Sequence, residues 1–270
     1  MTYTLFKNIF KGNTFRVEDL YLLEAFQISY LPGYLPEREF AAVLWAYPPI
    51  KTFLEKKCPE IISFIEHVTA KHGPAKDQQK LAEFNDTVIW TIADLLVYNK
   101  CPKEYDKQEF NKWDFNEVTS ITPLDDKVVI DTGAGTGRVT LEAALTAKYV
   151  YSIEPVTRLR QFIREKAKEM ELINVFVLEG FQHSIPLPDE FADVLLTSHA
   201  LGWQLEEELK EFERVTRKGG HIIHCPGTAE ESRNDEHKHQ RLISEDWQYD
   251  YSRYMEADGW KRKYWKQVEQ

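Results

Sequence analysis

The sequence of 270 residues has little cysteine, no basic excess and no long apolar run. Its three cysteines, Cys58, Cys101 and Cys225, are odd in number and far apart, which is typical of reduced thiols and argues against a disulfide framework. The 34 Lys and Arg face 44 Asp and Glu, for a net charge of -10, so an extended nucleic-acid surface is not expected. No apolar run approaches the ~20 residues of a membrane span, and the first ten residues lack the pattern of a secretory signal. We therefore expect a cytoplasmic protein with neither a membrane nor a nucleic-acid partner.

The histidines and cysteines do not form a metal-binding pattern either. His221 and His224 are three residues apart on an expected strand and therefore point to opposite faces. His237 and His239 lie in a polar, acidic segment. We expect no metal site.

Helical periodicity dominates the first part of the chain. Helices are expected over residues 16–29, 36–46, 59–71 and 77–98, the last with apolar residues at three- and four-residue spacing along one face. We assign residues 1–115 to an N-terminal helical region, a candidate lid over a site in the rest of the chain, and 116–270 to a second domain.

From residue 127 onward, short apolar runs alternate with amphipathic segments, which is typical of a parallel sheet built from βαβ units. The expected strands are residues 128–131, 149–153, 175–178, 194–197 and 221–225. The expected helices are residues 138–147, 156–170 and 206–217, the last ended by Lys218, Gly219 and Gly220.

The C-terminal segment predicts a β-hairpin after a polar helix around residues 229–244. Residues 247–255 alternate in polarity, Asp258-Gly259 is a turn signal, and residues 260–268 form the returning strand. A helix over residues 244–257 is the alternative. The hairpin carries basic residues that we expect to discourage edge pairing: Lys261, Arg262, Lys263 and Lys266.

The most informative stretch is residues 127–138, KVVIDTGAGTGR, which predicts a strand, a tight turn and the start of a helix. Gly133, Gly135 and Gly137 alternate with other residues, as expected where backbone must approach a ligand closely or adopt positive φ. A nucleotide-type ligand is the expected occupant. Glu154 follows the second strand, where an acid can accept hydrogen bonds from both hydroxyls of a ribose.

Two cofactor classes fit a glycine turn followed by such an acid, and the spacing separates them. A dinucleotide fingerprint has G-x-G-x-x-G/A, whereas here the third glycine comes one residue early and Arg138 stands where a small residue belongs. The pattern D-x-G-x-G-x-G resembles the loop of class I S-adenosylmethionine-dependent methyltransferases, in particular the small-molecule type. The resemblance extends over about residues 110–227, and the first 110 residues match no family that we recognise.

This resemblance implies an α/β fold, with a doubly wound, mainly parallel seven-stranded sheet of order 3-2-1-4-5-7-6 and an N-terminal helical region. It also implies S-adenosylmethionine as cofactor and a set of residues that hold it: Asp131, Thr132, Gly133, Ala134, Gly135, Gly137, Glu154, Pro155, Phe181, Gln182, Ser198 and His199. The family usually has an acid after the glycine that corresponds to Gly180, to accept the adenine amino group. This chain has Phe181 and then Gln182, so the adenine would be held by stacking or edge contact with Phe181 and by backbone amides or the Gln182 side chain.

Transfer from a sulfonium is an in-line displacement, so the protein chiefly aligns the reacting atoms. His199, at the end of the fourth strand, is the candidate general base, and its ordinary alternative is a hydrogen-bonded structural histidine. Trp203 and Trp113 are candidates for binding the acceptor. We expect methyl transfer to an oxygen or nitrogen of a small molecule, with a non-catalytic cofactor-binding or regulatory protein of the same fold as the alternative.

Overall fold

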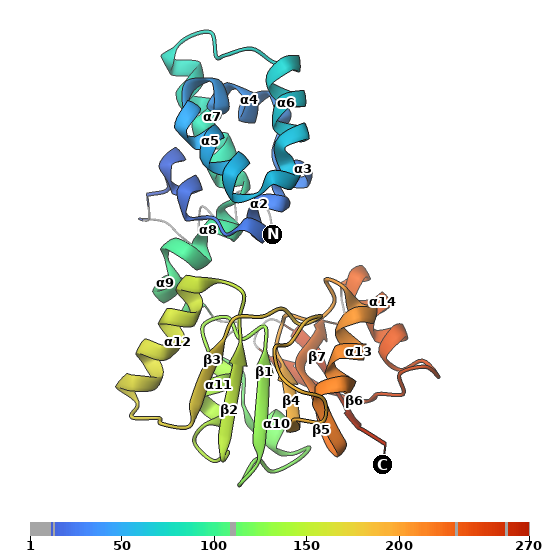
Figure 1. The fold of residues 1–270 in the computed structure, drawn as a ribbon. Helices are drawn as coiled ribbons and strands as arrows, with labels where there is room; N and C mark the ends of the chain where they lie inside the picture. Colours follow the sequence, from blue (N-terminus) through green and yellow to red (C-terminus); the bar gives the residue numbers. More distant parts are fainter. Residues whose placement is uncertain (1–11, 13, 109–111, 230–231, 257–258, 270) are drawn as a thin grey trace. The chain divides into compact units, whose positions relative to one another are not determined.

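The computed structural model describes residues 12, 14–108, 112–229, 232–256 and 259–269. The chain forms two compact units, residues 1–105 and 106–270, which are considered separately (Figure 1). No helix within the described residues combines the length and apolarity needed to cross a membrane.

The first unit is helical. It contains η1 (Val17–Leu22), α2 (Ala25–Ser29), α3 (Leu31–Tyr34), α4 (Glu37–Ala46), α5 (Pro48–Lys57), η2 (Pro59–Ile61), α6 (Ile62–Lys71), α7 (Gln78–Thr91) and α8 (Ala93–Lys100), and α9 (Pro102–Asp106) follows at the division of the units. Leu20, Phe40, Leu54 and Ile92 are among the fully buried side chains of its core. Helix α5 is not among the helices that the sequence predicts, and its two successive prolines stand in its first turn, where proline fits.

Two expected helices of this unit are interrupted. Residues 16–29 form η1 and α2 because Glu24 is extended and its N–H donates to the Gln27 side chain, which starts a new helix. Residues 77–98 form α7 and α8 because Ile92 leaves the helical conformation, at φ −108° and ψ 20°. Its side chain stays fully buried, so the apolar face continues although the helix does not.

The second unit contains α10 (Asn116–Thr119), β1 (Val128–Thr132), α11 (Arg138–Ala143), β2 (Tyr149–Ile153), α12 (Thr157–Glu169), β3 (Val175–Leu178), β4 (Ala192–Thr197), α13 (Leu205–Val215), β5 (Thr216–Ala229), α14 (Arg233–Leu242), β6 (Asp250–Glu256) and β7 (Gly259–Gln267). The seven strands have the order β3-β2-β1-β4-β5-β7-β6. Strands β1 to β5 are parallel, and β7 is antiparallel to β5 and β6. The predicted fold class and strand order are confirmed, and β6 with β7 forms the expected hairpin. Asp258 of the predicted turn lies outside the described residues.

Helices flank both faces of the sheet (Figure 1). Neighbouring residues of β1 alternate between the faces, so Val129 packs in the cluster with α10 and α11, and Ile130 in the cluster with α13 and α14. Both faces are therefore apolar, which explains the continuous apolar runs in the sequence.

The end of α13 differs from the prediction. The helix ends at Val215, and residues 216–220 already belong to β5, where the register against β4 shifts. A Cβ at Gly220 would lie 2.8 Å from the carbonyl oxygens of Arg217 and Asp193. Gly220 is thus required by close backbone approach in an irregular strand, and not by a helix end.

Candidate functional site

The glycine loop connects β1 to α11 and is bound to the end of β2. The backbone N–H groups of Gly133 and Ala134 both donate to the Ile153 carbonyl, at 3.0 and 3.2 Å. Gly133, Gly135 and Gly137 have φ values of 69°, 57° and 82°, in the region that favours glycine. The glycine loop after β1 is therefore held against the end of β2 by hydrogen bonds.

The three glycines have different surroundings. A Cβ at Gly133 would lie 2.6 Å from the Ala200 Cβ, and a Cβ at Gly137 would lie 2.9 Å from Cγ1 of Ile163 on α12. A Cβ at Gly135 would meet nothing within 4 Å. Two glycines thus permit close packing within the protein, and Gly135 borders open space that can receive a ligand.

Glu154 lies directly against this loop. One carboxylate oxygen accepts from the Gly135 N–H at 2.8 Å and the other from the Val156 N–H at 2.9 Å. Burial raises the pKa of Glu154 to about 7, while these hydrogen bonds oppose the rise. Each oxygen keeps a further lone pair, so the carboxylate is chemically suited to accept ribose hydroxyls.

Arg160 supports Glu154, and sequence reasoning missed it. Its guanidinium donates to the carbonyls of Glu154 and Pro155 at 2.9 and 2.7 Å, and to the Glu179 carboxylate at 2.6 Å. It is buried on the same side of α12 as Ile163. The available signal was an arginine on the apolar stripe of an amphipathic helix, which calls for a polar partner.

Asp131 is also buried beneath the loop. Its carboxylate accepts from the Thr140 hydroxyl of α11 at 2.5 Å, and burial raises its pKa to about 6. Asp131 thus fastens the first turns of α11 to β1. Thr132 next to it is fully buried.

The loop after β3 reaches back to the glycine loop. Phe181 and Ser184 exchange backbone hydrogen bonds, and the Phe181 ring stacks on His183 at 5.3 Å between ring centroids. The Gln182 amide donates from Nε2 to the Ala200 carbonyl at 2.6 Å. Gln182 also lies beside Gly133, whose Cβ would be 3.4 Å from the glutamine Cδ.

The loop after β4 carries Ser198, His199 and Trp203. His199 is exposed and has positive φ (54°), and its backbone N–H donates to the Pro226 carbonyl at 3.1 Å. Ser198 is half-buried and Trp203 is 69% exposed. These residues follow the carboxyl end of β4, the neighbour of β1, so they lie at the same sheet edge as the glycine loop.

Trp113 does not belong to this group. Its side chain is only 5% exposed and packs in the core cluster with Val118 and Val129. Arg138 donates to the Trp113 carbonyl at 2.8 Å, and its guanidinium carbon lies 5.6 Å from the indole centroid. The structure therefore assigns Trp113 to the core instead of an acceptor surface. Trp113 lies within the second unit, which comprises residues 106–270.

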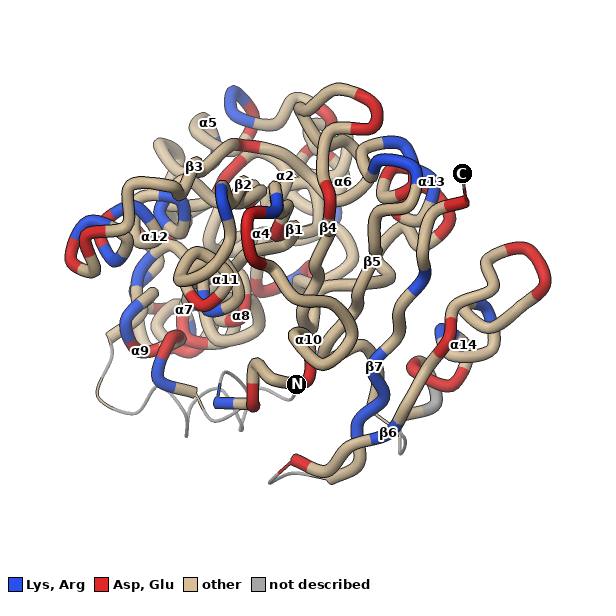
Figure 2. Tube along the Cα trace, turned by 90° about the horizontal axis from the view of Figure 1, so that it is seen from below, with Lys and Arg blue, Asp and Glu red and all other residues tan. Residues whose placement is uncertain are grey.

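Basic residues follow one another along β7, which is drawn largely in blue in Figure 2. The strand is an inner one, because β6 follows it in the sheet, so these residues do not guard an edge as expected. Lys263 pairs with Glu117 at 2.7 Å, Arg262 pairs with Glu236 at 2.9 Å, and Lys266 pairs with Glu213. These three residues therefore form ion pairs within the second unit.

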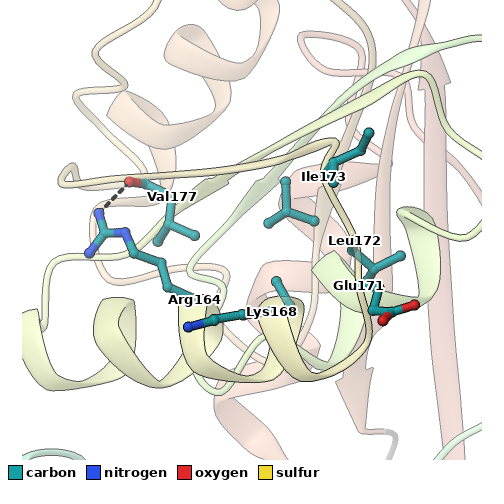
Figure 3. Close-up of a pocket in the computed structure, with 8 residues that line it drawn as sticks. Arg164, Lys168, Glu171, Leu172, Ile173 and Val177 are labelled. Atoms are coloured by element: carbon teal, nitrogen blue, oxygen red, sulfur yellow. Dashed lines mark hydrogen bonds between the residues drawn. The ribbon is translucent and has the colours of Figure 1, made fainter.

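A separate surface pocket lies between α12 and β3 (Figure 3). It has a volume of about 290 Å³, and Arg164 at its margin donates to the Val177 carbonyl at 2.7 Å. None of the expected site residues lines it: its lining consists of Arg164, Ala167, Lys168, Glu171, Leu172, Ile173, Val175 and Val177.

The comparisons with known proteins agree with this geometry. A family model described as a methyltransferase domain matches residues 130–224. An uncharacterized methyltransferase of Anoxybacillus flavithermus is 28% identical over 132 residues, which cover 47% of this chain and 60% of that protein. A demethylmenaquinone methyltransferase of a Geobacillus species is 27% identical over 143 residues, covering 47% and 59%. The chain thus spans about 60% of the length of these curated relatives.

Among solved structures, a SAM-dependent methyltransferase from Aquifex aeolicus has a similar fold, with a TM-score of 0.51 and 20% identity, covering 61% of this chain and 95% of that one. The family match shows a methyltransferase domain over residues 130–224, and the strand order and the Aquifex aeolicus structure show that the second unit has the fold of S-adenosylmethionine-dependent methyltransferases.

Proposed function

We propose that this protein transfers a methyl group from S-adenosylmethionine to an oxygen or nitrogen of a small-molecule acceptor. The observation that carries the proposal is the Glu154 carboxylate, which is held against the Gly135 N–H beside open space. A carboxylate with free lone pairs suits the ribose of this cofactor, and a glycine-rich loop lets the backbone approach the cofactor's amino-acid part.

The proposed cofactor residues come from the ends of four neighbouring strands. They are Asp131, Thr132, Gly133, Ala134, Gly135, Gly137, Glu154, Pro155, Phe181, Gln182, Ser198 and His199. Glu154 accepts the ribose hydroxyls, and Arg160 holds the turn that orients Glu154. Asp131 acts on the loop through Thr140, and this contact favours a positioning role over direct contact with the cofactor's ammonium group.

The bound cofactor would supply an activated methyl group, so the chain's own residues chiefly align the acceptor, and a base helps where the acceptor is a hydroxyl or a protonated amine. We assign the proton to His199, because an exposed imidazole near neutral pH suits this role. Trp203, which is largely exposed in the same loop, offers an aromatic surface to the acceptor. The role of the N-terminal unit as an acceptor cap stays a prediction.

A small acceptor is preferred to a nucleic acid on electrostatic grounds. The net charge is -10, and Arg262, Lys263 and Lys266 of β7 are paired with acids. An acidic chain whose basic strand is paired in this way is poorly suited to binding a phosphate backbone.

Calorimetry with S-adenosylmethionine and S-adenosylhomocysteine tests cofactor binding, and S-adenosylhomocysteine release in a screen of small-molecule alcohols, phenols and amines tests turnover. We expect both compounds to bind, and we expect His199→Ala to lower turnover by a much larger factor than it lowers this affinity. Failure of a folded sample to bind either compound would refute the proposal.

A non-catalytic cofactor-binding protein is the second candidate. Phe181 favours it, because a phenyl ring stands where the family usually has an acid. This candidate predicts affinity for S-adenosylhomocysteine without turnover of any acceptor class.

A further inference from the structure

The loop after β4 extends from the glycine loop to helix α14. Near its start, Ala200 lies against the first glycine of the candidate cofactor site, since a Cβ at Gly133 would be 2.6 Å from the Ala200 Cβ. Two residues later, Gly202 lies against the side chain of Lys238, which belongs to α14. Because successive Cα atoms are about 3.8 Å apart, Lys238 contacts this loop within about 8 Å of chain from the cofactor site.

Gly202 makes room for the Lys238 side chain. Its φ is 105°, and a Cβ at this position would lie 2.6 Å from Cε, 3.0 Å from Cδ and 3.2 Å from Nζ of Lys238. The end of the lysine therefore lies directly on the backbone of the loop. Glu208, which is buried, fixes this backbone: its carboxylate oxygens accept from the N–H groups of Gly202 at 2.7 Å and Gln204 at 2.9 Å. The ammonium group is thus held beside a loop of defined conformation.

The charge of Lys238 is only weakly compensated. Its ion pair with Asp235, three residues earlier on α14, has an N–O distance of 3.4 Å, and the other oxygen of Asp235 accepts from the Ala229 N–H at 2.9 Å. Arg241 of the same helix, by contrast, pairs with Glu206 at 2.8 Å. The Lys238 side chain is 26% exposed, which is typical of a lysine whose stem packs on protein while its ammonium group reaches solvent. A pair of this kind contributes little, so the ammonium group can bind a further anion.

We propose that Lys238 binds a carboxylate of the methyl acceptor, so that the acceptor is a small organic acid with an aromatic or apolar body. Trp203 directly follows Gly202 and is 69% exposed, and His199 is three residues before Gly202 in the same loop. This loop and Lys238 together offer the acceptor a base, an aromatic surface and a cation. The single positive charge of an ammonium group matches a carboxylate, whereas a phosphate carries nearly two negative charges. Lys238 is thus a specificity-determining residue, and this inference rests on the proposed function.

The test measures whether an acid is preferred to its amide. Protein saturated with S-adenosylhomocysteine is titrated by calorimetry with hydroxybenzoates and aminobenzoates, and with the corresponding amides, which lack the negative charge. Wild-type protein should bind the acids about tenfold to a hundredfold more tightly than the amides. Lys238→Met should bring this ratio close to one, and Lys238→Arg should keep a preference for the acids. Lys218→Met, which removes an exposed lysine near the amino end of β5, is the matched control and should keep the wild-type ratio.

The cofactor also has a carboxylate, and a second comparison separates the two sources. Methylthioadenosine contains the adenine and ribose of the cofactor but lacks its amino-acid part. Lys238→Met should weaken the binding of neither S-adenosylhomocysteine nor methylthioadenosine. A loss confined to S-adenosylhomocysteine would assign Lys238 to the cofactor's own carboxylate and overturn the inference.

The inference is also overturned if wild-type protein saturated with S-adenosylhomocysteine binds none of the acids, or binds acids and amides equally; the proposed cofactor site would then still stand. If wild-type protein does not bind S-adenosylhomocysteine at all, the proposed function itself fails. Equal melting temperatures by circular dichroism establish that each variant is folded.

Discussion

Gly135 and Gly137 form a matched pair with which the glycine loop can be tested. Both have positive φ, at 57° and 82°, so alanine at either position costs roughly 1–2 kcal/mol of backbone strain. At Gly135 the new methyl group meets nothing within 4 Å, whereas at Gly137 it lies 2.9 Å from Cγ1 of Ile163. Ile163 is fully buried and β-branched, so it cannot move aside easily, and overpacking adds about 1–3 kcal/mol.

We therefore expect Gly135→Ala to lower the free energy of unfolding by about 1–2 kcal/mol and Gly137→Ala by about 2–5 kcal/mol. Binding should respond in the opposite order. Gly135→Ala should weaken S-adenosylhomocysteine binding by about tenfold or more, because its methyl group enters the space proposed for the cofactor. Gly137→Ala should weaken binding less, since its methyl group points at α12.

Urea unfolding and calorimetry on the whole chain measure the two effects. Ile163→Ala provides a further control, because removing the branched side chain should make the double variant with Gly137→Ala less destabilised than the sum of the single variants. Equal destabilisation by the two glycine variants would refute the packing argument. If Gly135→Ala binds S-adenosylhomocysteine as tightly as the wild-type protein, the cofactor does not occupy the space beside Gly135.

Three further predictions concern buried charges. Because the pKa of Glu154 is raised in the folded state, from 4.5 to about 7, its contribution to stability is fully present below pH 4.5 and is lost as the pH rises through 7. The loss is on the order of 3 kcal/mol, and urea unfolding at several pH values should show a smaller loss in Glu154→Gln. Arg160→Leu should cost about 2–4 kcal/mol and weaken S-adenosylhomocysteine binding in calorimetry, because the turn after β2 loses its hydrogen-bonded cation; unchanged affinity would contradict the positioning role. Lys263→Met should lower the free energy of unfolding by about 1–3 kcal/mol, because Lys263 is buried and donates to Glu117 and Ser120. An unchanged midpoint of urea unfolding would show that α10 is held by apolar packing alone.

The sequence predicts where the strands of the second unit lie, most of its helices and its glycine loop. These features depend on local chemistry: apolar runs mark strands buried on both faces, three- and four-residue periodicity marks helices, and alternating glycines mark a turn with positive φ. The position of Glu154 after β2 followed from the same local pattern, since strand ends gather at one edge of a parallel sheet.

Only the tertiary structure decided what the individual side chains contact. Trp113 is an aromatic residue of the kind that lines binding sites, yet it is buried in the core. The expected helix of residues 77–98 is interrupted at Ile92, which is also buried. Arg160 and the Gln182 amide are directed by carbonyl groups that only the folded backbone brings near, from the turn after β2 and from Ala200 after β4. Local patterns fix the backbone's periodicity, whereas the direction of a polar side chain is set by partners far away in the sequence.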